Sequence, residues 1–322
     1  MTTDANVAPH NLGFLLVPEF TLLAFSSAIE PLRMANHISG KELYRWSVIS
    51  DDGGEVCASD GIRLAADYGI EDEVKFDTII ACGGVDIDRN YHKQTLRWLS
   101  RKARSGVTMG GICTGSYLLA KAGLLDDYLC TIHWEHLAGM REEFPLIKSS
   151  DHLYCIDRDR LTCSGGTAPM DMILNVIGME HGKTLSAAIS EMFVYDRMRD
   201  CSDLQRVPLK HRIGNAQPKL QEIVALMEAN IEETITLDEL AGYVGLSRRQ
   251  LERLFQKHLS CSPSRYYVNL RLLRAQQLLK QTGLSIIEVA TACGFVSTPH
   301  FSGCYRTFFG FPPRDERASN AG

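Results

Sequence analysis

SIIEVATACGFVSTPHFSGCYRTFFGFPPR, residues 285–314, is the stretch that decides the fold of the C-terminal part of this chain. The apolar residues at its start, in IIEVA, predict one short amphipathic helix. Gly294 then supplies the backbone freedom that a sharp turn needs. A second helix is expected to begin at Thr298, with Pro299 in its first turn, where a missing N–H costs little. The stretch therefore predicts two short helices joined by a tight turn.

The second of these helices has an apolar face and a polar face. Phe301, Tyr305 and Phe308 recur at helical spacing, so we expect all three to pack inward. The small and polar residues then face outward, namely Thr298, Pro299, Ser302 and Gly303. A helix, a glycine turn and a second helix with a polar outer face form the helix-turn-helix layout, in which the second helix lies in the DNA major groove.

The residue pattern of this stretch resembles a known family. I-x-x-V-A-x-x-C-G-F-x-S-x-x-H-F-x-x-x-Y-R-x-x-F-G-x-x-P is similar to the second DNA-binding half of the AraC-type transcription regulators. The resemblance implies that five residues of the second helix-turn-helix contact DNA: Ser297, Thr298, Pro299, His300 and Arg306. Gly303 departs from the pattern, because relatives usually have a basic residue there. We therefore expect a weaker DNA contact at that position and a lower helix propensity.

A second unit of the same kind lies about 50 residues upstream, in TLDELAGYVGLSRRQLERLFQK over 236–257. Thr236 and Glu239 predict a capping box, and Gly245 makes the turn. The second helix of this unit leaves a charged face outward, formed by Arg248, Arg249, Glu252 and Arg253. Arginine binds guanine or phosphate, and glutamate accepts a hydrogen bond from cytosine. The alternative, an ordinary solvated helix face, is disfavoured because two such units recur.

The segment between the two units, SPSRYYVNLRLLRAQQLLKQ over 262–281, predicts one long helix. At 1.5 Å per residue it spans about 30 Å, close to the roughly 34 Å of one DNA turn. Two recognition helices joined in this way can enter successive major grooves of one duplex. The double unit is similar to the whole AraC-type module over about 218–317.

The distribution of charge agrees with a DNA-binding C-terminal part. The 322 residues suffice for two domains, each with its own core. Residues 1–204 carry 19 basic and 29 acidic side chains, a net charge of −10, whereas residues 205–322 carry 15 basic and 10 acidic ones, a net charge of +5. This asymmetry places the phosphate-binding surface in the C-terminal third.

The composition also bears on location and redox state. No apolar stretch approaches the roughly 20 residues of a membrane span, and MTTDANVAPHN lacks the features of a secretion signal. We therefore expect a cytoplasmic protein with no membrane partner. The ten cysteines are scattered and form no C-x-x-C pair, which favours buried, reduced thiols over a disulfide framework.

The N-terminal two-thirds alternates between strands and helices. LGFLLV over 12–17 is a continuous apolar run, typical of a strand buried on both faces. Further strands are expected at 44–50, 77–82 and 107–112, with helices between them, the first of which Pro31 kinks or divides. The alternation predicts a doubly wound α/β domain with a parallel sheet, whose sites form at the carboxyl ends of the strands.

One turn at this expected edge has the composition of a nucleophile elbow. GGICTGS over 110–116 surrounds Cys113 with small residues. Together with SGGTAPMDMILNVI over 164–177, it resembles the DJ-1/PfpI superfamily, which has a class I glutamine amidotransferase-like fold. The resemblance implies that Cys113 is the elbow cysteine and that Glu30 is the glutamate facing it. Hydrolytic members usually have histidine after the cysteine, and here Thr114 stands in that position.

We therefore expect this site to bind an effector without transforming it, and to need no metal or cofactor. Its expected residues are Glu30, Trp46, Gly83, Gly84, Cys113, Thr114 and Trp134. A helix N-terminus for a carboxylate, beside a negative and aromatic wall, suits a small zwitterion or a quaternary ammonium compound. The alternative for any single aromatic, including Tyr117, is a place in the core. His133 and His136 lack a third metal ligand at suitable spacing.

The expected organisation is a DJ-1/PfpI-like sensor over 11–199, a linker over 200–217 and a double helix-turn-helix domain over 218–317. This is the architecture of the GlxA-like regulators. SAIEPLRMANHISGKELYRW and SAAISEMFVYDRMR resemble the regulators of glycine betaine and carnitine catabolism, the betaine-responsive type above all. The resemblance implies a homodimeric activator of betaine and dimethylglycine breakdown genes, with duplex DNA and RNA polymerase as partners. The alternatives are a regulator responding to carnitine or arginine, and a cysteine-dependent hydrolase or deglycase-like enzyme fused to a DNA-binding module.

Overall fold

The computed structural model describes residues 8–205 and 217–318. The chain divides into two compact units, Met1–Gln205 and Arg206–Gly322. Most of the segment expected as a linker, residues 206–216, lies outside the described residues. Each unit has its own buried apolar core, with Phe14 and Leu15 in the N-terminal unit and Leu240 and Phe255 in the C-terminal unit.

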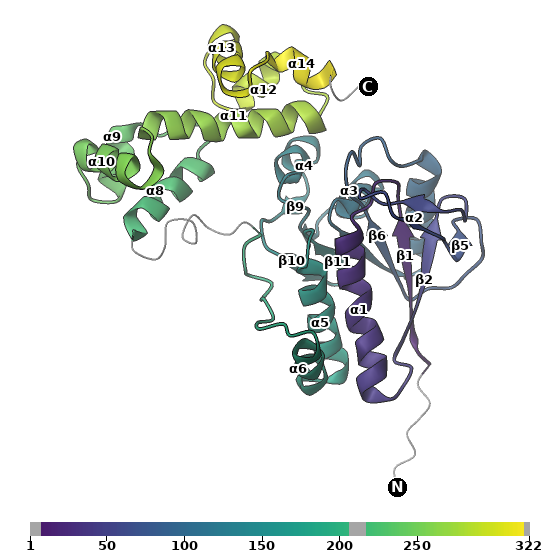
Figure 1. Ribbon diagram of the computed structural model, residues 1–322. Coiled ribbons are helices and arrows are strands. Elements are labelled where there is room, and N and C mark those ends of the chain that lie inside the picture. Colours follow the sequence, from purple (N-terminus) through teal and green to yellow (C-terminus); the bar gives the residue numbers. More distant parts are fainter. Residues whose placement is uncertain (1–7, 206–216, 319–322) are drawn as a thin grey trace. The chain divides into compact units, whose positions relative to one another are not determined.

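The N-terminal unit is built on a seven-stranded sheet with the order β10-β11-β7-β6-β1-β2-β5 (Figure 1). Its strands are β1 (His10–Leu16), β2 (Tyr44–Ser50), β5 (Tyr68–Gly69), β6 (Thr78–Cys82), β7 (Thr108–Ile112), β10 (Tyr154–Asp157) and β11 (Arg160–Cys163). All neighbours are parallel except β10 and β11. Two small two-stranded sheets accompany it, formed by β3 (Val56–Cys57) with β4 (Arg63–Leu64) and by β8 (Leu129–Cys130) with β9 (Lys148–Ser149).

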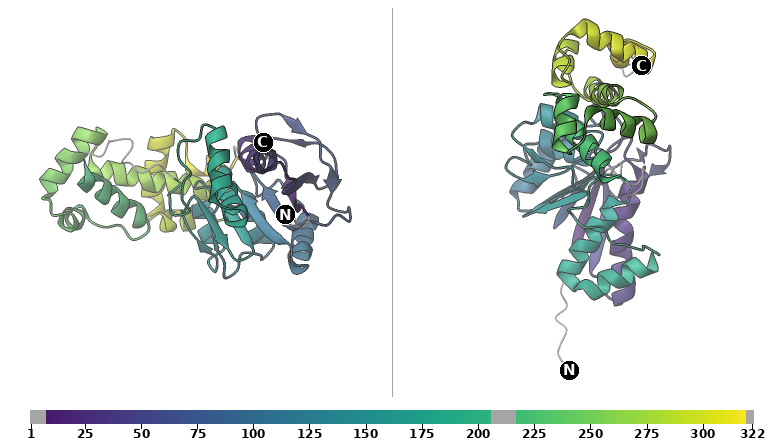
Figure 2. Two further views of the ribbon diagram at one scale, coloured as in Figure 1. Left: turned by 90° about the horizontal axis from the view of Figure 1, so that it is seen from below. Right: turned by 90° about the vertical axis from the view of Figure 1, so that its left-hand side faces the viewer.

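Helices cover both faces of the sheet, as the turned views in Figure 2 show. One layer contains α1 (Leu22–Ser39), α5 (Ala168–His181) and α6 (Lys183–Met192); the other contains α2 (Lys93–Arg104), α3 (Gly115–Lys121) and α4 (Leu137–Glu143). Successive residues of β1 point to opposite faces, so Phe14 joins one core cluster and Leu15 the other. The expected doubly wound α/β fold is confirmed.

Helix α1 runs through Pro31 without a break and ends at Ser39. Pro31 removes one hydrogen bond from the helix interior, which costs about 3 kcal/mol. The buried face of the helix, with Ala28, Leu32 and Ala35 in the core, offsets this cost. Proline therefore marks no domain boundary here.

The carboxyl ends of four neighbouring strands form one row. Leu16 pairs with Cys82, Cys82 with Ile112, and Ile112 with Cys163. The residues that follow each strand therefore emerge at the same edge of the sheet. This row positions the candidate ligand site.

The C-terminal unit is all-helical. Its helices are α8 (Pro218–Ala229), α9 (Leu237–Tyr243), α10 (Arg248–Leu259), α11 (Pro263–Gln281), α12 (Ile286–Ala292), α13 (Thr298–Phe309) and α14 (Pro313–Ala318). Figure 1 shows α8 to α10 near one end of α11 and α12 to α14 near the other. Gly245 and Gly294 make the two turns with φ of +62° and +69°, a backbone conformation that glycine adopts without strain. The expected pair of helix-turn-helix units is confirmed.

One inward-facing residue was assigned wrongly from the spacing. Phe308 is 40% exposed, whereas Phe301 and Tyr305 are fully buried. The third inward place belongs to Phe309, whose ring lies 4.5 Å from that of Tyr305. The three inward residues thus recur at i, i+4 and i+8, because the face that meets α11 and α14 follows this row of the helix. Ile287 on α12 is also exposed, at 65%.

Two expectations from composition concern the whole chain. All ten cysteines are free, and six of them are buried. Among the residues that the structure describes, no helix has the length and hydropathy that a membrane span requires.

Candidate ligand site and nucleic-acid interface

Cys113 occupies a strained turn between β7 and α3. Its φ is +57°, a left-handed conformation that is uncommon for a residue with a side chain. The turn is tightly enclosed, because a Cβ added at Gly115 would lie 2.0 Å from the carbonyl oxygen of Ala81. The Cys113 amide donates to the Ser164 carbonyl at 3.4 Å. The turn therefore has the strand-to-helix geometry of a nucleophile elbow.

The neighbours of the Cys113 thiol come from three other segments. The Thr21 hydroxyl lies 3.5 Å from the sulfur, and the His133 amide donates to the Cys113 carbonyl at 3.1 Å. A Cβ added at Gly165 would lie 3.1 Å from the sulfur and 2.8 Å from the His133 ring. Glycine at position 165 thus allows the thiol and the imidazole ring to border the same small space, which we call the Cys113 site.

Three of the expected residues, Thr114, Gly83 and Gly84, form hydrogen bonds near Cys113. The Thr114 hydroxyl donates to the Gly84 carbonyl at 2.8 Å, and the Thr21 amide donates to the Gly83 carbonyl at 3.2 Å. Thr114 is buried, so its hydroxyl fastens two strand ends together. The structure brings Gly83, Gly84, Cys113 and Thr114 together at the carboxyl edge of the sheet.

The Cys113 site favours neutral side chains. Burial raises the pKa of the Cys113 thiol, and the hydrogen bond from Thr21 offsets only part of this rise. Burial lowers the pKa of His133, against the opposing charge of Glu135. At pH 7 the thiol therefore keeps its proton and the imidazole is uncharged. A reactive thiolate–imidazolium pair does not form under these conditions.

The structure places Glu30 away from Cys113, and this corrects the expected pairing. Glu30 lies nine residues beyond Thr21 on α1, roughly 13 Å further along the helix axis. Its carboxylate accepts two hydrogen bonds from Arg33, at 2.9 and 2.7 Å, on an exposed face. Thr21 faces the thiol instead. Thr21 comes soon after β1, at the carboxyl edge of the sheet where sites of parallel sheets form.

The expected aromatic residues are divided between different places. Trp46 pairs with Leu12 in the first half of β2, about four residues from the carboxyl edge, so it lies away from the Cys113 site. Tyr117 belongs to the core on the α2–α3 face, where its hydroxyl donates to Glu143 at 3.1 Å. Trp134 is the one of these three beside the Cys113 site, with its ring centre 5.7 Å from that of His133.

The two histidines near the site, His133 and His136, have different surroundings. His133 lies 3.7 Å from the Glu135 carboxylate, and burial lowers the pKa of His136 to about 4. Among the residues that the structure describes, no group of three His, Cys, Asp or Glu side chains is arranged to hold a metal ion.

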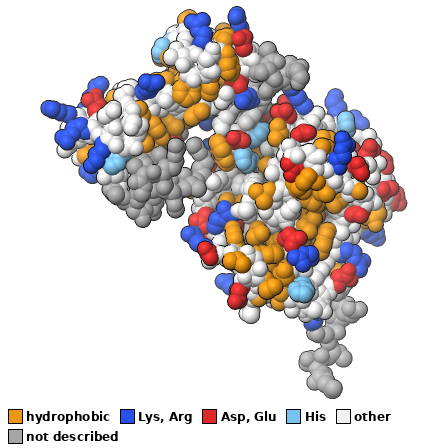
Figure 3. Space-filling model, viewed as in Figure 1, with side chains coloured by type: hydrophobic (Ala, Val, Ile, Leu, Met, Phe, Trp, Pro, Cys, Tyr) orange, Lys and Arg blue, Asp and Glu red, His pale blue; other side chains and the backbone are white. Residues whose placement is uncertain are grey.

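Helix α10 presents a charged surface. Its start is fixed by a capping box between Ser247 and Gln250. Figure 3 shows Lys and Arg side chains gathered over this end of the C-terminal unit. Four expected DNA-contacting residues are exposed there: Arg248, Arg249, Glu252 and Arg253. Three of them, Arg249, Glu252 and Arg253, line a hollow of about 400 Å³ between α10 and the start of α11.

Helix α13 presents a surface with little charge. Ser297 caps the helix by accepting a hydrogen bond from the His300 amide. The expected contact residues Ser297, Pro299, His300 and Arg306 are exposed, and Thr298 is partly exposed. Val296, just before the cap, is fully exposed, which the spacing did not indicate. The first turn of a recognition helix meets base edges, so this end of α13 is suited to small and apolar contacts.

The long helix α11 contacts both helix-turn-helix units through two side chains that lie one helical turn apart. The Tyr267 hydroxyl donates to the Asn230 carbonyl and accepts from the Ile235 amide, in the first unit. The Arg271 guanidinium donates to the carbonyls of Cys293 and Gly294 at 2.7 and 2.6 Å, in the second unit. Its guanidinium also lies 4.0 Å from the Phe295 ring centre. The polar contacts of α11 therefore fix the turn of the second unit directly.

Comparison with known proteins gives matches for both units. Residues 14–179 match the DJ-1/PfpI family, and residues 240–319 match a helix-turn-helix domain. The HTH-type transcriptional regulator GbdR of Pseudomonas aeruginosa is 62% identical over 312 residues, which cover 97% of this chain and 85% of that protein. The HTH-type transcriptional regulator GlxA of Rhizobium meliloti is 35% identical over 303 residues, with 94% of each chain covered.

A solved structure is also similar to part of the chain. The crystal structure of an AraC family transcriptional regulator from Pseudomonas putida is 28% identical, with a TM-score of 0.53. It covers 57% of this chain and all of that one.

Proposed function

The chain belongs to the HTH-type transcriptional regulators that join a DJ-1/PfpI domain to an AraC-type DNA-binding domain, and from this premise we propose that it activates genes of glycine betaine and dimethylglycine breakdown. Its sensor unit binds a small quaternary or tertiary ammonium carboxylate without transforming it. Its C-terminal unit binds the target promoters. The proposed sensor comprises residues 11–199 and the proposed DNA-binding domain 218–317. Of the proposed linker 200–217, residues 200–205 belong to the compact N-terminal unit.

The observation that carries the sensing role is the neutral, buried elbow thiol. A nucleophilic cysteine needs a lowered pKa, and burial moves the pKa of Cys113 the other way. Thr114, in the position after the cysteine, uses its hydroxyl to bind the Gly84 carbonyl. The elbow geometry is thus kept, while burial holds the thiol in its protonated form.

The wall of the Cys113 site suits an ammonium group. The Trp134 ring stands beside His133, and the Glu135 carboxylate is within 3.7 Å of the His133 ring nitrogen. An aromatic face and one negative charge attract a quaternary ammonium group without a specific hydrogen bond. Glu135 therefore takes the role of the negative wall that the motif had assigned to Glu30.

DNA binding follows from the two recognition helices. Residues 205–322 carry a net charge of +5, which favours contact with phosphates. Effector binding favours the state of the chain that fits the operator, and the gain equals the difference in effector affinity between the two states. A homodimer acting in the cytoplasm would place two such chains on tandem half-sites and recruit RNA polymerase.

Calorimetric titration of the full chain tests the effector. Glycine betaine and dimethylglycine are expected to bind more tightly than carnitine or arginine. Trp134→Leu is expected to weaken glycine betaine binding by about 2- to 30-fold, since a cation–π contact contributes about 0.5–2 kcal/mol. Trp46→Leu is the matched control, because Trp46 lies in the first half of β2, away from the carboxyl edge of the sheet. The glycine betaine affinity of this variant is expected to stay near that of the wild type.

The outcomes separate the alternatives. Tighter binding of carnitine or arginine would assign the protein to a different effector. Equal losses in both tryptophan variants would mean that the loss comes from the stability of the unit, and would remove the ammonium group from the Trp134 wall. Melting of each variant, followed by the fluorescence of the remaining tryptophans, checks that it is folded.

A further inference from the structure

The last described segment of the N-terminal unit, Tyr195–Gln205, folds back onto the sheet domain. It follows α6 and directly precedes residues 206–216, through which the chain continues to the DNA-binding unit. Two anchors, one near each end, hold the segment in place. We call this segment the clasp.

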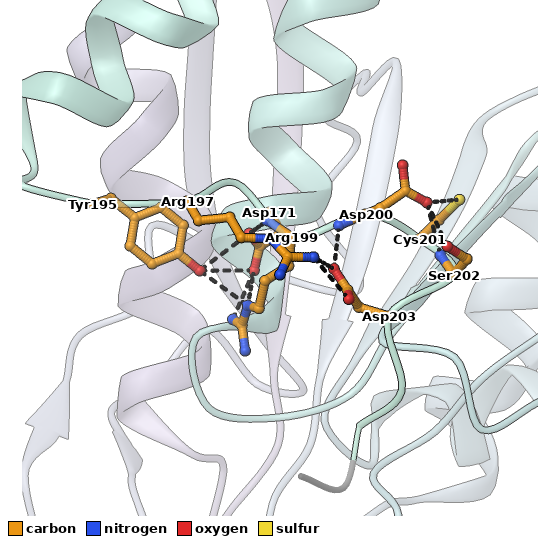
Figure 4. Close-up of polar contacts among 8 residues, drawn as sticks. All are labelled: Asp171, Tyr195, Arg197, Arg199, Asp200, Cys201, Ser202 and Asp203. Atoms are coloured by element: carbon orange, nitrogen blue, oxygen red, sulfur yellow. Dashed lines mark hydrogen bonds and ion pairs between the residues drawn. The ribbon is translucent and has the colours of Figure 1, made fainter. Parts of the chain in front are cut away.

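The first anchor is Asp171, which is 1% exposed in the first turn of α5. The Arg199 guanidinium forms an ion pair with it at 2.6 Å, and the Arg199 amide donates to it at 2.7 Å. The Tyr195 hydroxyl donates to both carboxylate oxygens at 3.0 Å. Figure 4 shows Tyr195 and Arg199 converging on this carboxylate. A buried charge with several hydrogen bonds makes this anchor specific.

The first anchor reaches one wall of the Cys113 site. Arg199 also donates from Nη2 to the Thr167 hydroxyl at 2.7 Å, and Thr167 is the residue that precedes α5. The loop before it contributes the Ser164 carbonyl, which accepts from the Cys113 amide. Gly165 in the same loop borders both the thiol and the His133 ring. Arg199 thus contacts the loop that encloses the thiol.

The second anchor is Gln205, which reaches the other wall. The two N–H groups of its Nε2 are shared among three acceptors, the Thr131 hydroxyl at 2.6 Å, the Ile132 carbonyl at 2.9 Å and the His152 carbonyl at 3.0 Å. Ile132 directly precedes His133, whose amide donates to Cys113. The Gln205 Oε1 atom is buried and has no hydrogen-bond partner among the residues that the structure describes. This arrangement therefore leaves one acceptor unsatisfied, which carries a desolvation cost.

We propose that the clasp couples the Cys113 site to the DNA-binding unit. Arg199 and Gln205 are the positioning residues, because each contacts one wall of the site. A ligand that moves the 164–167 loop relative to residues 131–133 changes the distance between the two places where the clasp is attached. These are the contact of Arg199 with Thr167 and the contacts of Gln205 with residues 131 and 132. The clasp then shifts between a held and a released state, and the unsatisfied Gln205 acceptor lowers the cost of release. This inference rests on the proposed effector binding at the Cys113 site.

Three variants test the coupling in the full chain. Gln205→Met removes the hydrogen bonds that the Nε2 amide group donates. Thr167→Val removes only the contact between Arg199 and the loop. Arg197→Met is the control, because Arg197 pairs with Asp203 inside the clasp at 2.9 Å and is largely exposed. In Figure 4 the dashed lines from the Arg197 guanidinium lead to the Asp203 carboxylate. Tryptophan fluorescence melting confirms that each variant is folded.

The measured quantity is the affinity for a duplex selected from a random pool by the wild-type chain, by fluorescence anisotropy with and without glycine betaine. In the wild type the ratio of the two affinities is expected between about 5 and 150. In Gln205→Met it is expected to fall to within about twofold of one, with an intermediate value in Thr167→Val and no change in Arg197→Met. Calorimetry is expected to show that all three variants still bind glycine betaine. Clasp release is also expected to shift the ligand-free DNA affinity of Gln205→Met by several fold.

The outcomes distinguish the coupling from the effector assignment. A wild type that responds to glycine betaine, with Gln205→Met responding equally, overturns the clasp and leaves the proposed function standing. A wild type that binds no glycine betaine, with ligand-free DNA affinity shifted in Gln205→Met and unchanged in Arg197→Met, overturns the effector and supports the clasp. No binding and no shift would overturn both.

Discussion

The two helix-turn-helix units share one backbone plan but expose different chemistry. Each begins with a capping box, and each turns at a glycine with positive φ. Helix α10 then exposes Arg248, Arg249 and Arg253, whereas α13 exposes Pro299, Gly303 and a single arginine, Arg306. The same fold therefore carries one recognition helix with a strongly basic surface, α10, and one with little charge, α13.

The difference indicates a division of labour on DNA. Arginine side chains give affinity that falls with salt, since binding them releases counterions from the phosphates. Small and apolar side chains give contacts with thymine methyl groups and with groove shape, which salt hardly changes. The first unit would then supply most of the affinity, and the second unit would adjust register and sequence preference.

The largest expected effect comes from removing the side chain that holds the second unit. Arg271→Met leaves the carbonyls of Cys293 and Gly294 without their charged donor. Such a loss costs about 2–3 kcal/mol. Amide hydrogen exchange over 286–309 is therefore expected to become roughly 30- to 150-fold faster, with 237–259 close to wild type. Equal acceleration in both ranges would mean that α11 does not hold the units separately.

A smaller effect is expected from the recognition arginines themselves. Arg253→Ala is expected to weaken binding to the selected duplex by about 1–3 kcal/mol, which is about 5- to 150-fold, and to reduce the salt slope by about 1. Arg306→Ala, near the end of α13, is expected to cost less than 1 kcal/mol, because the base-reading positions of a recognition helix lie near its start. Fluorescence anisotropy across a salt series measures both. A larger loss for Arg306→Ala than for Arg253→Ala would mean that α13, and not α10, supplies most of the electrostatic affinity for DNA.

The smallest effect is expected at Gly303, where the two helices can be made more alike. A Cβ at this position meets nothing within 4 Å, so side chains fit there. Gly303→Ala is expected to stabilise α13 by up to about 1 kcal/mol without changing the salt slope. Gly303→Lys is expected to add a similar stability and to steepen the salt slope by about 0.9, through one phosphate contact. Identical slopes for the two variants would show that position 303 faces away from DNA.

The fold could be predicted from the sequence wherever a local pattern decides the structure. Apolar strand runs, helix caps and turn glycines such as Gly245 and Gly294 act over a few residues, so their pattern carries the answer. The assignment of Phe308 was wrong, because the choice between i+7 and i+8 depends on which neighbour the helix meets. Phe309 contacts Tyr305 and Phe311, and Phe311 lies beyond the end of the helix.

The positions of the candidate site residues were predictable in part, for a related reason. Cys113, Thr114, Gly83 and Gly84 follow strand ends, and parallel strands bring such residues to one edge. Glu30 was expected from the family resemblance and Trp46 from its nearness to a strand end, but neither fixes how far along a helix or strand the residue lies. The clasp residues Arg199 and Gln205 lie where periodicity is weak, so only the three-dimensional contacts identify their partners.

The connecting helix also restricts how the target sites of this protein can change. Within α11, one inserted residue would turn the following unit by about 100° and advance it by 1.5 Å. Substitutions on α10 or α13 alter which bases are preferred, one at a time, while the gap between the two half-sites stays the same. We therefore expect the promoters recognised by descendants of this protein to change in base sequence while the spacing between their half-sites stays constant.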